Sequence, residues 1–445
     1  LNRVYLNIGL FSEEWLRHFN PVVGGKTISP IPIASAQKNS SYWQATEQGT
    51  PDTALFFLKS TVPDLLKEAP GGDKFLTDSP AVIDRGKTVF AETCARCHSS
   101  KGPEVPADRS IANCIGPNYL ECFKRYWAYT QTADYKKQMN AIVHAPDFLD
   151  GNYLSTDARI PVTLLRTNAC SPLATNGIRD NIWDNFTSDS YKNLPSVGTV
   201  TVYDPYTGEK TPYKMPAGGR GYTRPPSLIA LWSSAPFLLN NSVGPFNQDP
   251  SVEGRMRAFD ASIEQMLWPE KREHDSVLAD KIPGRIDRTT ARSYVYLPVG
   301  YLPDLLQPLA NSFATNGSLL IGPIPQGTPI GLLANTKLRA EPGDSVPEHA
   351  ANLAKLTGAM VLNAGALASA NQTSDDELRQ KLSGLREPFM ALSKCPDFVV
   401  NRGHYFGSAM FNQQDGLSGD EKAFGTEPEL NDNDKRALIA FLKTF

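Results

Sequence analysis

The pentapeptide Cys94-Ala95-Arg96-Cys97-His98 decides how this sequence is interpreted. Its spacing is that of the attachment site for a c-type haem. Two thiols three positions apart on one helical turn can form thioethers with the two vinyl groups of a porphyrin. The next residue, His98, then supplies the proximal nitrogen ligand of the iron. The motif therefore predicts one covalently bound haem c, held by Cys94, Cys97 and His98.

Two other chemistries use closely spaced cysteines. A thioredoxin-like redox pair needs C-x-x-C after a β-strand, whereas residues 82–93 have the pattern of a helix. A four-cysteine zinc site could combine Cys94 and Cys97 with a second pair, Cys114 and Cys122. That second pair is separated by seven residues instead of the usual two to four. Both alternatives fit the sequence less well than haem does.

Four cysteines lie outside the haem motif, and their even number permits two disulfide bonds. Haem c is normally attached outside the cytoplasm, where disulfides also persist. We expect Cys114–Cys122 to close a short loop and Cys170–Cys395 to connect the middle of the chain with its C-terminal region. The protein is therefore expected to be periplasmic or secreted. The chain begins at Leu1 without a signal-peptide pattern, so we expect a processed product or a fragment.

Composition argues against several classes of partner. The 445 residues carry 44 basic and 47 acidic side chains, a formal net charge of −3, so charge gives no reason to propose nucleic acid or an anionic membrane. Apolar residues make up 40% of the chain, which is enough for a sizeable core. The 35 prolines and 33 glycines predict long loops. No run of 18 or more apolar residues exists, so no transmembrane segment is expected.

Helices are expected on both sides of the haem motif in the sequence. Residues 82–96 have apolar residues on one side and lead directly into the motif. A second helix begins near residue 432 and runs to the C-terminus. In a cytochrome c core these two helices cross closely, which needs a small residue at the crossing. Gly86 and Phe90, set against Leu438 and Phe441, fit that need.

The expected fold is mainly α, with a cytochrome c-like haem domain, large loop-rich insertions and small β-hairpins. One hairpin is predicted at 198–214, where β-branched residues flank the turn Asp204-Pro205-Tyr206-Thr207-Gly208. We expect residues 1–80 to be an N-terminal segment, a remnant of or linker from a preceding domain. Residues 81–445 would then form the haem domain, with a long insertion over about 120–400.

Several segments resemble the di-haem cytochrome c peroxidase superfamily. Asp84-Arg85-Gly86-Lys87-Thr88-Val89-Phe90, followed by the haem motif, is similar to a bacterial cytochrome c domain. The stretch 222–243 resembles the superfamily's PP-L–W–AP-L-N-SV segment, and the stretches 396–407 and 438–443 resemble the same group. The rubber oxygenase (latex-clearing di-haem) branch is the most similar, and the similarity is to its second-haem half only. Proteins of that branch carry two C-x-x-C-H sites, whereas this chain has one.

The resemblance implies that the haem on His98 serves electron transfer. The chain is then either the C-terminal part of a longer di-haem enzyme or a one-haem relative. We therefore predict a c-type cytochrome for extracytoplasmic electron transfer, with a redox partner protein or a second haem domain as its partner. The alternative is a haem-dependent peroxidase or dioxygenase, of which this chain is the electron-transfer half or the whole catalyst.

The ligand opposite His98 separates these functions. His404, in Asn-Arg-Gly-His-Tyr-Phe-Gly, is similar in position to the distal histidine of the oxygenase-like branch, which implies bis-His ligation. Met215 stands before a proline, a common setting for a cytochrome methionine, and Met410 or an open position are further alternatives. Two imidazoles suit electron transfer, a methionine raises the potential, and an open position allows O₂ or peroxide chemistry.

Two sets of residues are expected to support the haem. Arg220 and Arg224 lie in a glycine-rich segment and are candidate partners for the anionic haem propionates. Gly116-Pro117-Asn118 follows the motif and is expected to place a carbonyl on Nδ1 of His98, which would fix the orientation of its ring.

Overall fold

The computed structural model describes residues 29–175, 177–301, 307–312, 314–337, 340, 344–368 and 374–445. Within these ranges helices dominate, and the strands form small two-stranded antiparallel sheets. The predicted mainly α fold with small β-hairpins is therefore confirmed. None of the described helices combines the length and the apolar character needed to cross a membrane.

The chain divides into two compact units, each assembled from separate segments. The first unit contains the chain up to Thr61, Ala174–Lys192 and Ile286–Phe398, and the second contains Val62–Leu173, Asn193–Arg285 and Val399–Phe445. The haem motif lies in the second unit, together with parts of the predicted insertion on either side of residues 174–192. The predicted bounds of 1–80 and 81–445 stay a prediction, and residues 1–28 of the N-terminal segment lie outside the described residues.

Two consecutive helices of the second unit carry the haem motif. Helix α5 (Pro80–Thr93) begins after Ser79, whose hydroxyl accepts a hydrogen bond from the Val82 amide at 3.4 Å. Proline is favoured at the first helical position because its fixed φ suits the helix and no amide hydrogen is needed there. Helix α6 (Ala95–His98) follows after Cys94. The helix predicted over 82–96 is therefore present, divided at the first cysteine of the motif.

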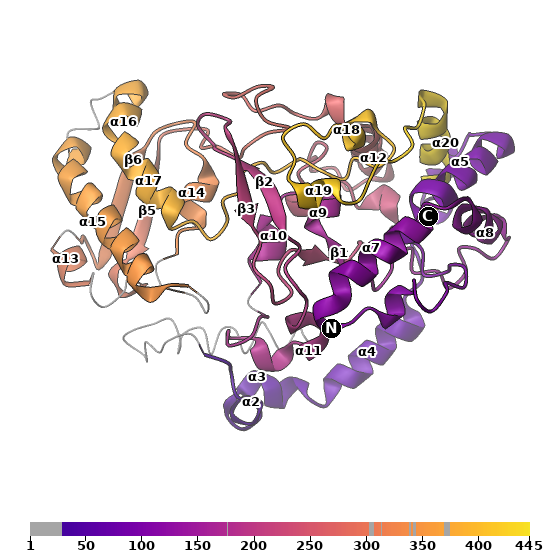
Figure 1. Cartoon of the computed structure of the whole chain (residues 1–445), viewed down its shortest axis with the longest axis horizontal. Coiled ribbons are helices and arrows are strands. Elements are labelled where there is room, and N and C mark those ends of the chain that lie inside the picture. Colours follow the sequence, from indigo (N-terminus) through magenta and orange to yellow (C-terminus); the bar gives the residue numbers. More distant parts are fainter. Residues whose placement is uncertain are drawn as a thin grey trace. The chain divides into compact units, whose positions relative to one another are not determined.

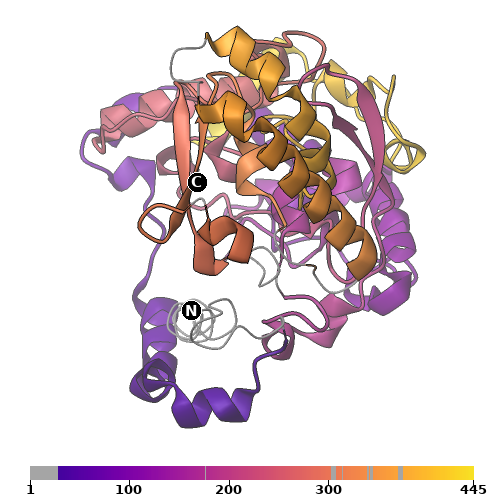
Figure 2. The ribbon, with the colours of Figure 1, turned by 90° about the vertical axis from the view of Figure 1, so that its left-hand side faces the viewer.

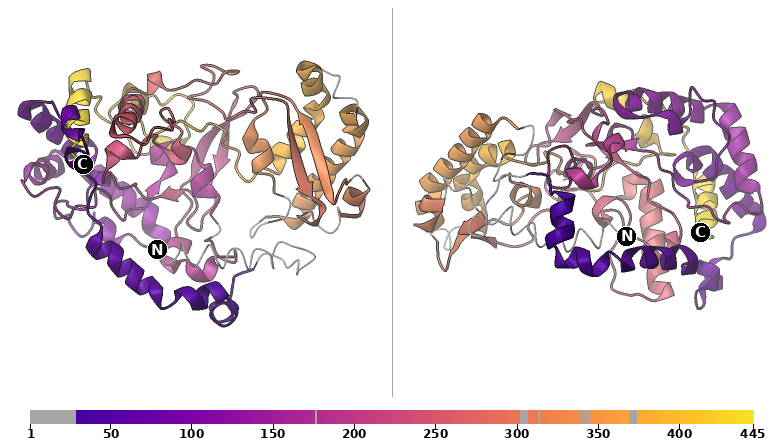
Figure 3. Two further views of the ribbon diagram at one scale, coloured as in Figure 1. Left: turned by 180° about the vertical axis from the view of Figure 1, so that it is seen from behind. Right: turned by 90° about the horizontal axis from the view of Figure 1, so that it is seen from below.

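The C-terminal helix α20 (Asp432–Leu442) packs against α5, as the sequence predicts, and the two lie side by side in Figures 1 and 3. Gly86 lies at the point of contact. A Cβ atom at Gly86 would lie 2.1 Å from the carbonyl oxygen of Ala437 and 2.8 Å from Cβ of Phe441. Only glycine allows this close approach of the two backbones.

An aromatic cluster fills the space next to this crossing. The ring of Phe90 packs edge-on against Phe441 and Phe445, with centroid distances of 5.5 Å and 5.3 Å. Phe148 packs against the same ring at 6.1 Å. All four rings are buried, and edge-to-face packing of this kind adds to the stabilisation from burial. The main apolar core of the second unit therefore lies beside the haem motif.

Replacing Gly86 with alanine is expected to destabilise the second unit by about 1–3 kcal/mol, because the added methyl group clashes with backbone atoms of α20. The clash must exceed the gain of about 1 kcal/mol that alanine brings inside a helix. Gly384→Ala is the matched control, since Gly384 also lies in a helix and has open space around it. Denaturant unfolding measures both variants, and equal stability of the two would contradict the close crossing.

The second unit contains further helices. They are α7 (Tyr119–Thr130), α8 (Ala133–His144), α9 (Val162–Leu165), α10 (Cys170–Leu173), α12 (Val252–Leu267), α18 (Ala409–Asn412) and α19 (Gly419–Lys422). Of these, α7, α8 and α12 contribute to this core. Helix α8 packs against α5, and α7 begins in the loop that the Cys114–Cys122 disulfide closes. That disulfide was predicted from the sequence and is confirmed. Cys170 and Cys395 are also disulfide-bonded, in keeping with the second predicted pair.

Two small sheets belong to the second unit. Strands β2 (Thr199–Tyr203) and β3 (Lys210–Lys214) form the predicted hairpin, with Thr199 paired with Lys214. Strands β1 (Ile160–Pro161) and β4 (Tyr222–Thr223) pair over two residues only. Helix α19 is tied to β2 because Glu421 accepts hydrogen bonds from the amide and hydroxyl of Thr201.

The described residues of the first unit form helices and one hairpin. The hairpin is β5 (Ser293–Pro298) with β6 (Ser318–Ile324). The helices are α2 (Ile33–Asn39), α3 (Ser41–Thr46), α4 (Gly49–Ser60), α11 (Asp189–Lys192), α13 (Gln307–Asn311), α14 (Ile330–Ala334), α15 (Val346–Ala368), α16 (Asp375–Lys381) and α17 (Ser383–Ala391). Figure 2 faces α15 to α17, where α17 packs against α15 through Leu356, Leu385 and Leu392.

Candidate functional site

The haem motif forms a single helical turn at the end of α5. The amides of Cys97 and His98 both donate to the carbonyl of Cys94, each at 3.0 Å. This turn brings both cysteines and His98 together, as thioether attachment to one porphyrin requires. Cys94 and Cys97 are free thiols, and among the described residues they are the free cysteines.

The environment of the two thiols argues against both alternative chemistries. Burial raises the pKa of Cys94 to about 12 and that of Cys97 to about 11, so both stay protonated at neutral pH. A redox pair depends on a thiolate with a lowered pKa. The Cys114–Cys122 disulfide removes the other two ligands of the zinc alternative. No cluster of three or more metal-ligating side chains occurs in the part of the chain that the structure describes.

A backbone carbonyl from a distant segment orients the ring of His98. Nδ1 of His98 lies 3.2 Å from the carbonyl oxygen of Pro226. Since a carbonyl only accepts, Nδ1 carries the proton and Nε2 keeps a lone pair for a metal. The prediction that Gly116-Pro117-Asn118 supplies this carbonyl is wrong, because the segment following β4 reaches the ring instead. Burial lowers the pKa of His98 to about 4, so the imidazole is neutral at pH 7.

The ring of His404 faces the ring of His98. Their centroids are 6.2 Å apart and the ring planes meet at 56°. Burial, followed by the proximity of His98 and of Arg272, lowers the pKa of His404 to about 3. The structure thus brings together two neutral imidazoles from residues that lie more than 300 positions apart in the sequence.

The backbone around His404 holds this position by an unusual conformation. His404 has a φ of +53°, and Gly403 before it has a φ of +86°. A Cβ atom at Gly403 would lie 2.4 Å from the amide nitrogen of Thr167, so the loop needs glycine at this point. The His404 amide donates to the carbonyl of Leu165 at 2.7 Å. Positive φ at a residue other than glycine costs energy and is found at functional sites more often than elsewhere.

The spacing of the two rings fits one metal ion between them. A histidine nitrogen lies about 2.0–2.1 Å from a bound metal in proteins, so two imidazoles on opposite sides of one ion have centroids about 6.4 Å apart. The observed 6.2 Å agrees with that distance. Together with the two free thiols on the turn of His98, the donor set fits a covalent haem with two axial histidines.

Hydrogen bonds from Arg272 stabilise the loop that carries His404. Its guanidinium donates to the carbonyls of Asn401 and Gly403 at 3.0 Å and 2.8 Å. It also donates to Gln265, near the end of α12, at 2.8 Å. Arg272 is buried, and burial lowers its pKa. No local sequence pattern distinguishes Arg272, since an arginine within a charged, histidine-containing run is usually a surface residue.

A buried ion pair lies behind the haem motif. Nη2 of Arg96 donates to Oε2 of Glu427 at 2.6 Å, and the side chains of the two residues are 3% and 2% exposed. The guanidinium also lies over the ring of Trp127, 4.0 Å from its centroid, and over Phe406 at 5.7 Å. Phe406 in turn packs edge-on against His404 at 5.1 Å. Arg96 therefore connects the haem motif with the loop of the opposite histidine through aromatic contacts.

The remaining predicted site residues occupy varied positions. Met215 is buried near Gly221, and its role as the alternative ligand stays a prediction. Arg220 is half-buried, whereas Arg224 is exposed and lies 3.6 Å from Asp157. Their predicted role with the haem propionates stays a prediction. Met410 lines a separate pocket, described below.

Comparison with known proteins supports the identification of residues 94–98 as a haem attachment motif. Residues 83–155, which include the haem motif and helices α7 and α8, match the Cytochrome c family. No characterised protein and no solved structure matches the chain. Cytochromes c are electron carriers that transfer electrons to partner proteins. Residues 83–155 therefore form a cytochrome c domain, whose iron is held in a covalently attached haem c.

Proposed function

We propose that this chain is a one-haem c-type cytochrome with bis-His ligation by His98 and His404, which transfers electrons outside the cytoplasm. The observation that carries the proposal is the 6.2 Å separation of the two imidazole rings. Two nitrogen ligands leave no exchangeable position on the iron and favour electron transfer over O₂ or peroxide chemistry. Cys94 and Cys97 would hold the porphyrin by thioethers.

Haem bound in this way would accept and donate one electron reversibly. The chain's own residues orient it: the Pro226 carbonyl fixes the tautomer and plane of His98, while Arg272 and Gly403 fix His404. We further propose that Arg220 and Arg224 face the haem propionates. If they do, removing their charge should lower the potential, since nearby positive charge favours the reduced iron.

The extracytoplasmic location rests on the disulfide bonds. The Cys114–Cys122 bond closes a loop within the cytochrome c domain, and such bonds persist in oxidising compartments. Haem attachment to C-x-x-C-H belongs to the same compartments. The disulfide bond and the haem attachment motif therefore both support a periplasmic or secreted location.

The partner is proposed to be a redox protein or a second haem domain. The resemblance of residues 222–243 to the di-haem peroxidase superfamily supports this proposal. Within that segment Pro226 contacts His98, so part of the resemblance lies at the haem site itself. We also propose that, within this superfamily, the chain is most similar to the rubber oxygenase branch.

The visible spectrum with and without CO tests the assignment of His404. We expect wild-type protein to be low-spin in both oxidation states and unchanged by CO, because both axial positions are filled. His404→Ala should give a five-coordinate iron that binds CO. Met215→Leu is the control, and it should leave the spectrum unchanged because Met215 is a core residue. These measurements need only the holoprotein and a spectrometer.

A CO-bound form of the wild-type protein would overturn the proposal. The iron would then have an open position, and the haem-dependent peroxidase or dioxygenase alternative would be favoured. An unchanged spectrum in His404→Ala together with a changed spectrum in Met215→Leu would assign the sixth ligand to the methionine instead. CO binding by the wild-type protein thus distinguishes an enzyme from an electron carrier, and the spectra of the two variants identify the sixth ligand of the iron.

A further inference from the structure

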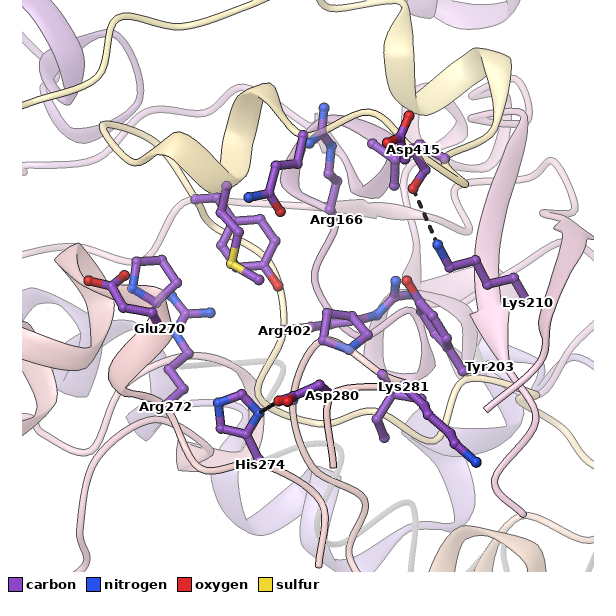
Figure 4. A pocket seen from close by; sticks show the side chains of 18 of the residues that line it. Arg166, Tyr203, Lys210, Glu270, Arg272, His274, Asp280, Lys281, Arg402 and Asp415 are labelled. Carbon is purple, nitrogen blue, oxygen red and sulfur yellow. Dashed lines mark hydrogen bonds and ion pairs between the residues drawn. The ribbon is translucent and has the colours of Figure 1, made fainter. Parts of the chain in front are cut away.

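A pocket of about 390 Å³ opens beside the loop that carries His404 (Figure 4). The residues that form it lie in the stretch 269–284 after α12, in the β2–β3 hairpin, at Arg166 after α9 and in the stretch 402–417. All of them belong to the second unit. The volume lies within the range of sites for small molecules. Neither of the proposed haem ligands, His98 and His404, lines the pocket.

Buried positive charge distinguishes the lining of this pocket. Arg166, Arg272 and Arg402 all line it and are only 4%, 5% and 3% exposed. The acidic residues of the lining are exposed instead, and they are Glu270, Glu273, Asp280 and Asp415. Two of these acids already have side-chain partners, since Asp280 lies 3.0 Å from the ring of His274 and Glu273 forms an ion pair with Arg285 at 2.8 Å. Cations therefore line the interior, and partly neutralised acids line the rim.

Two of the arginines lack an anionic partner. Within the described residues neither Arg166 nor Arg272 forms an ion pair with a carboxylate. Arg166 donates from Nη1 to the carbonyl of Phe411 at 2.7 Å, but its Nε is buried without a hydrogen-bond partner. The carboxylate of Glu421 acts on Arg166 electrostatically from beyond hydrogen-bond distance.

A third buried group in the pocket also lacks a partner. The hydroxyl of Tyr405 is buried and forms no hydrogen bond, and this residue is 7% exposed. Burying a hydroxyl without a hydrogen bond is unfavourable, and burying a charge without a compensating partner is more so. Native proteins keep such groups where a ligand satisfies them. Unpaired guanidinium and hydroxyl donors together are suited to an oxyanion.

We propose that this pocket binds a small free oxyanion, a carboxylate or phosphate, through Arg166 and the hydroxyl of Tyr405, and that its occupancy adjusts the potential of the haem. The first part is independent of the haem ligands. The second part rests on the proposed bis-His cytochrome function.

The coupling follows from the contacts between the pocket and the His404 loop. Tyr405 lines the pocket and directly follows His404 in the sequence. Arg272 lines the same pocket and donates a hydrogen bond to the carbonyl of Gly403, the residue before His404. An anion bound there offsets positive charge close to the iron. Oxidised haem carries one more positive charge than reduced haem, so the anion favours the oxidised form. By linkage, oxidation must tighten anion binding by the same factor by which the anion shifts the redox equilibrium.

Citrate and inorganic phosphate are suitable probes for titration calorimetry on the oxidised holoprotein. We expect saturable binding with one site per chain. Arg166→Gln should weaken the affinity about tenfold or more, since a charge-assisted hydrogen bond is lost. Tyr405→Phe should weaken it by a smaller factor. Arg257→Gln is the matched control, because Arg257 is exposed and pairs with Asp249 away from the pocket.

Redox titration in the presence of the same probe tests the coupling. The midpoint potential should fall as citrate saturates the wild-type protein, and it should not respond to citrate in Arg166→Gln. Binding of citrate without any change in potential would overturn the coupling alone. The CO experiment decides the axial ligands separately, so failure of the cytochrome proposal and failure of the anion site are distinguishable.

Haem propionates are the other source of the same carboxylate chemistry. If they occupied the pocket, citrate would not bind the holoprotein, while Arg166→Gln would change the potential in the absence of any added anion. That result would overturn the proposal of a free anion. Equal affinity of wild type, Arg166→Gln and Arg257→Gln would also overturn it, because binding would then be general surface attraction.

Discussion

Replacing Glu427 with glutamine is expected to lower the free energy of unfolding of the second unit by about 3–5 kcal/mol. The carboxylate of Glu427 pairs with Arg96 at 2.6 Å, and both side chains are almost completely buried. With a neutral glutamine at this position the guanidinium of Arg96 stays charged and buried. Among the described residues no other carboxylate forms an ion pair with it. Denaturant unfolding of the holoprotein measures the loss.

The same substitution should disturb the haem site. Arg96 stands between the two attachment cysteines in the sequence. Its guanidinium lies over the rings of Trp127 and Phe406, and Phe406 packs against His404. Glu264→Gln is the matched control, since Glu264 forms an exposed ion pair with Lys271, and exposed pairs contribute little. We expect this control to unfold like the wild type. Equal stability of the two variants would contradict the assignment of Arg96 and Glu427 as a structural pair.

Replacing Arg272 with methionine is expected to destabilise the protein by about 3 kcal/mol or more and to release His404 in part of the molecules. Methionine fills much of the same space but offers no donor to the carbonyls of Gln265, Asn401 and Gly403. The loop then loses the contacts that hold His404 in its left-handed conformation. Partial five-coordinate haem and partial CO binding should therefore appear in the visible spectrum.

Two further variants separate the positioning role of Arg272 from its charge. Arg272→Lys keeps the charge but cannot reproduce the forked hydrogen bonds, so it should also bind CO in part. Arg257→Met removes an exposed arginine from α12 and should remain six-coordinate. If Arg272→Met were less stable but fully six-coordinate, the residue would stabilise the fold without positioning His404.

Local patterns in the sequence predicted a large part of the structure. The pattern Cys94-Ala95-Arg96-Cys97-His98 places its side chains on one helical turn regardless of the rest of the fold. Gly86 identified the helix crossing because only a residue without a side chain permits that approach. The Cys114–Cys122 disulfide and the β2–β3 hairpin also depend on residues that are close in the sequence.

The supporting contacts of the site could not be predicted in this way. Pro226 is 128 positions from His98, and Glu427 is 331 positions from Arg96. Nothing in the local sequence says which of many carbonyls or carboxylates will reach a given side chain. Gly116-Pro117-Asn118 lies close to His98 in the sequence, but the carbonyl that reaches Nδ1 of His98 comes from Pro226. Only the family resemblance points to His404 as the ligand opposite His98, since no local sequence pattern distinguishes it from the other histidines.

The sequence by itself determined the covalent chemistry of this protein, since thioether spacing and helical periodicity depend on neighbours within one or two turns. Only the tertiary structure decided which ring faces His98, which carbonyl orients it and which buried charges surround it. These contacts join segments separated by more than a hundred residues, and they form only when the apolar core has brought α5, α12 and the loop of His404 together. The same folding buries Arg166 and Tyr405 around one pocket, a property that neither residue shows in its local sequence.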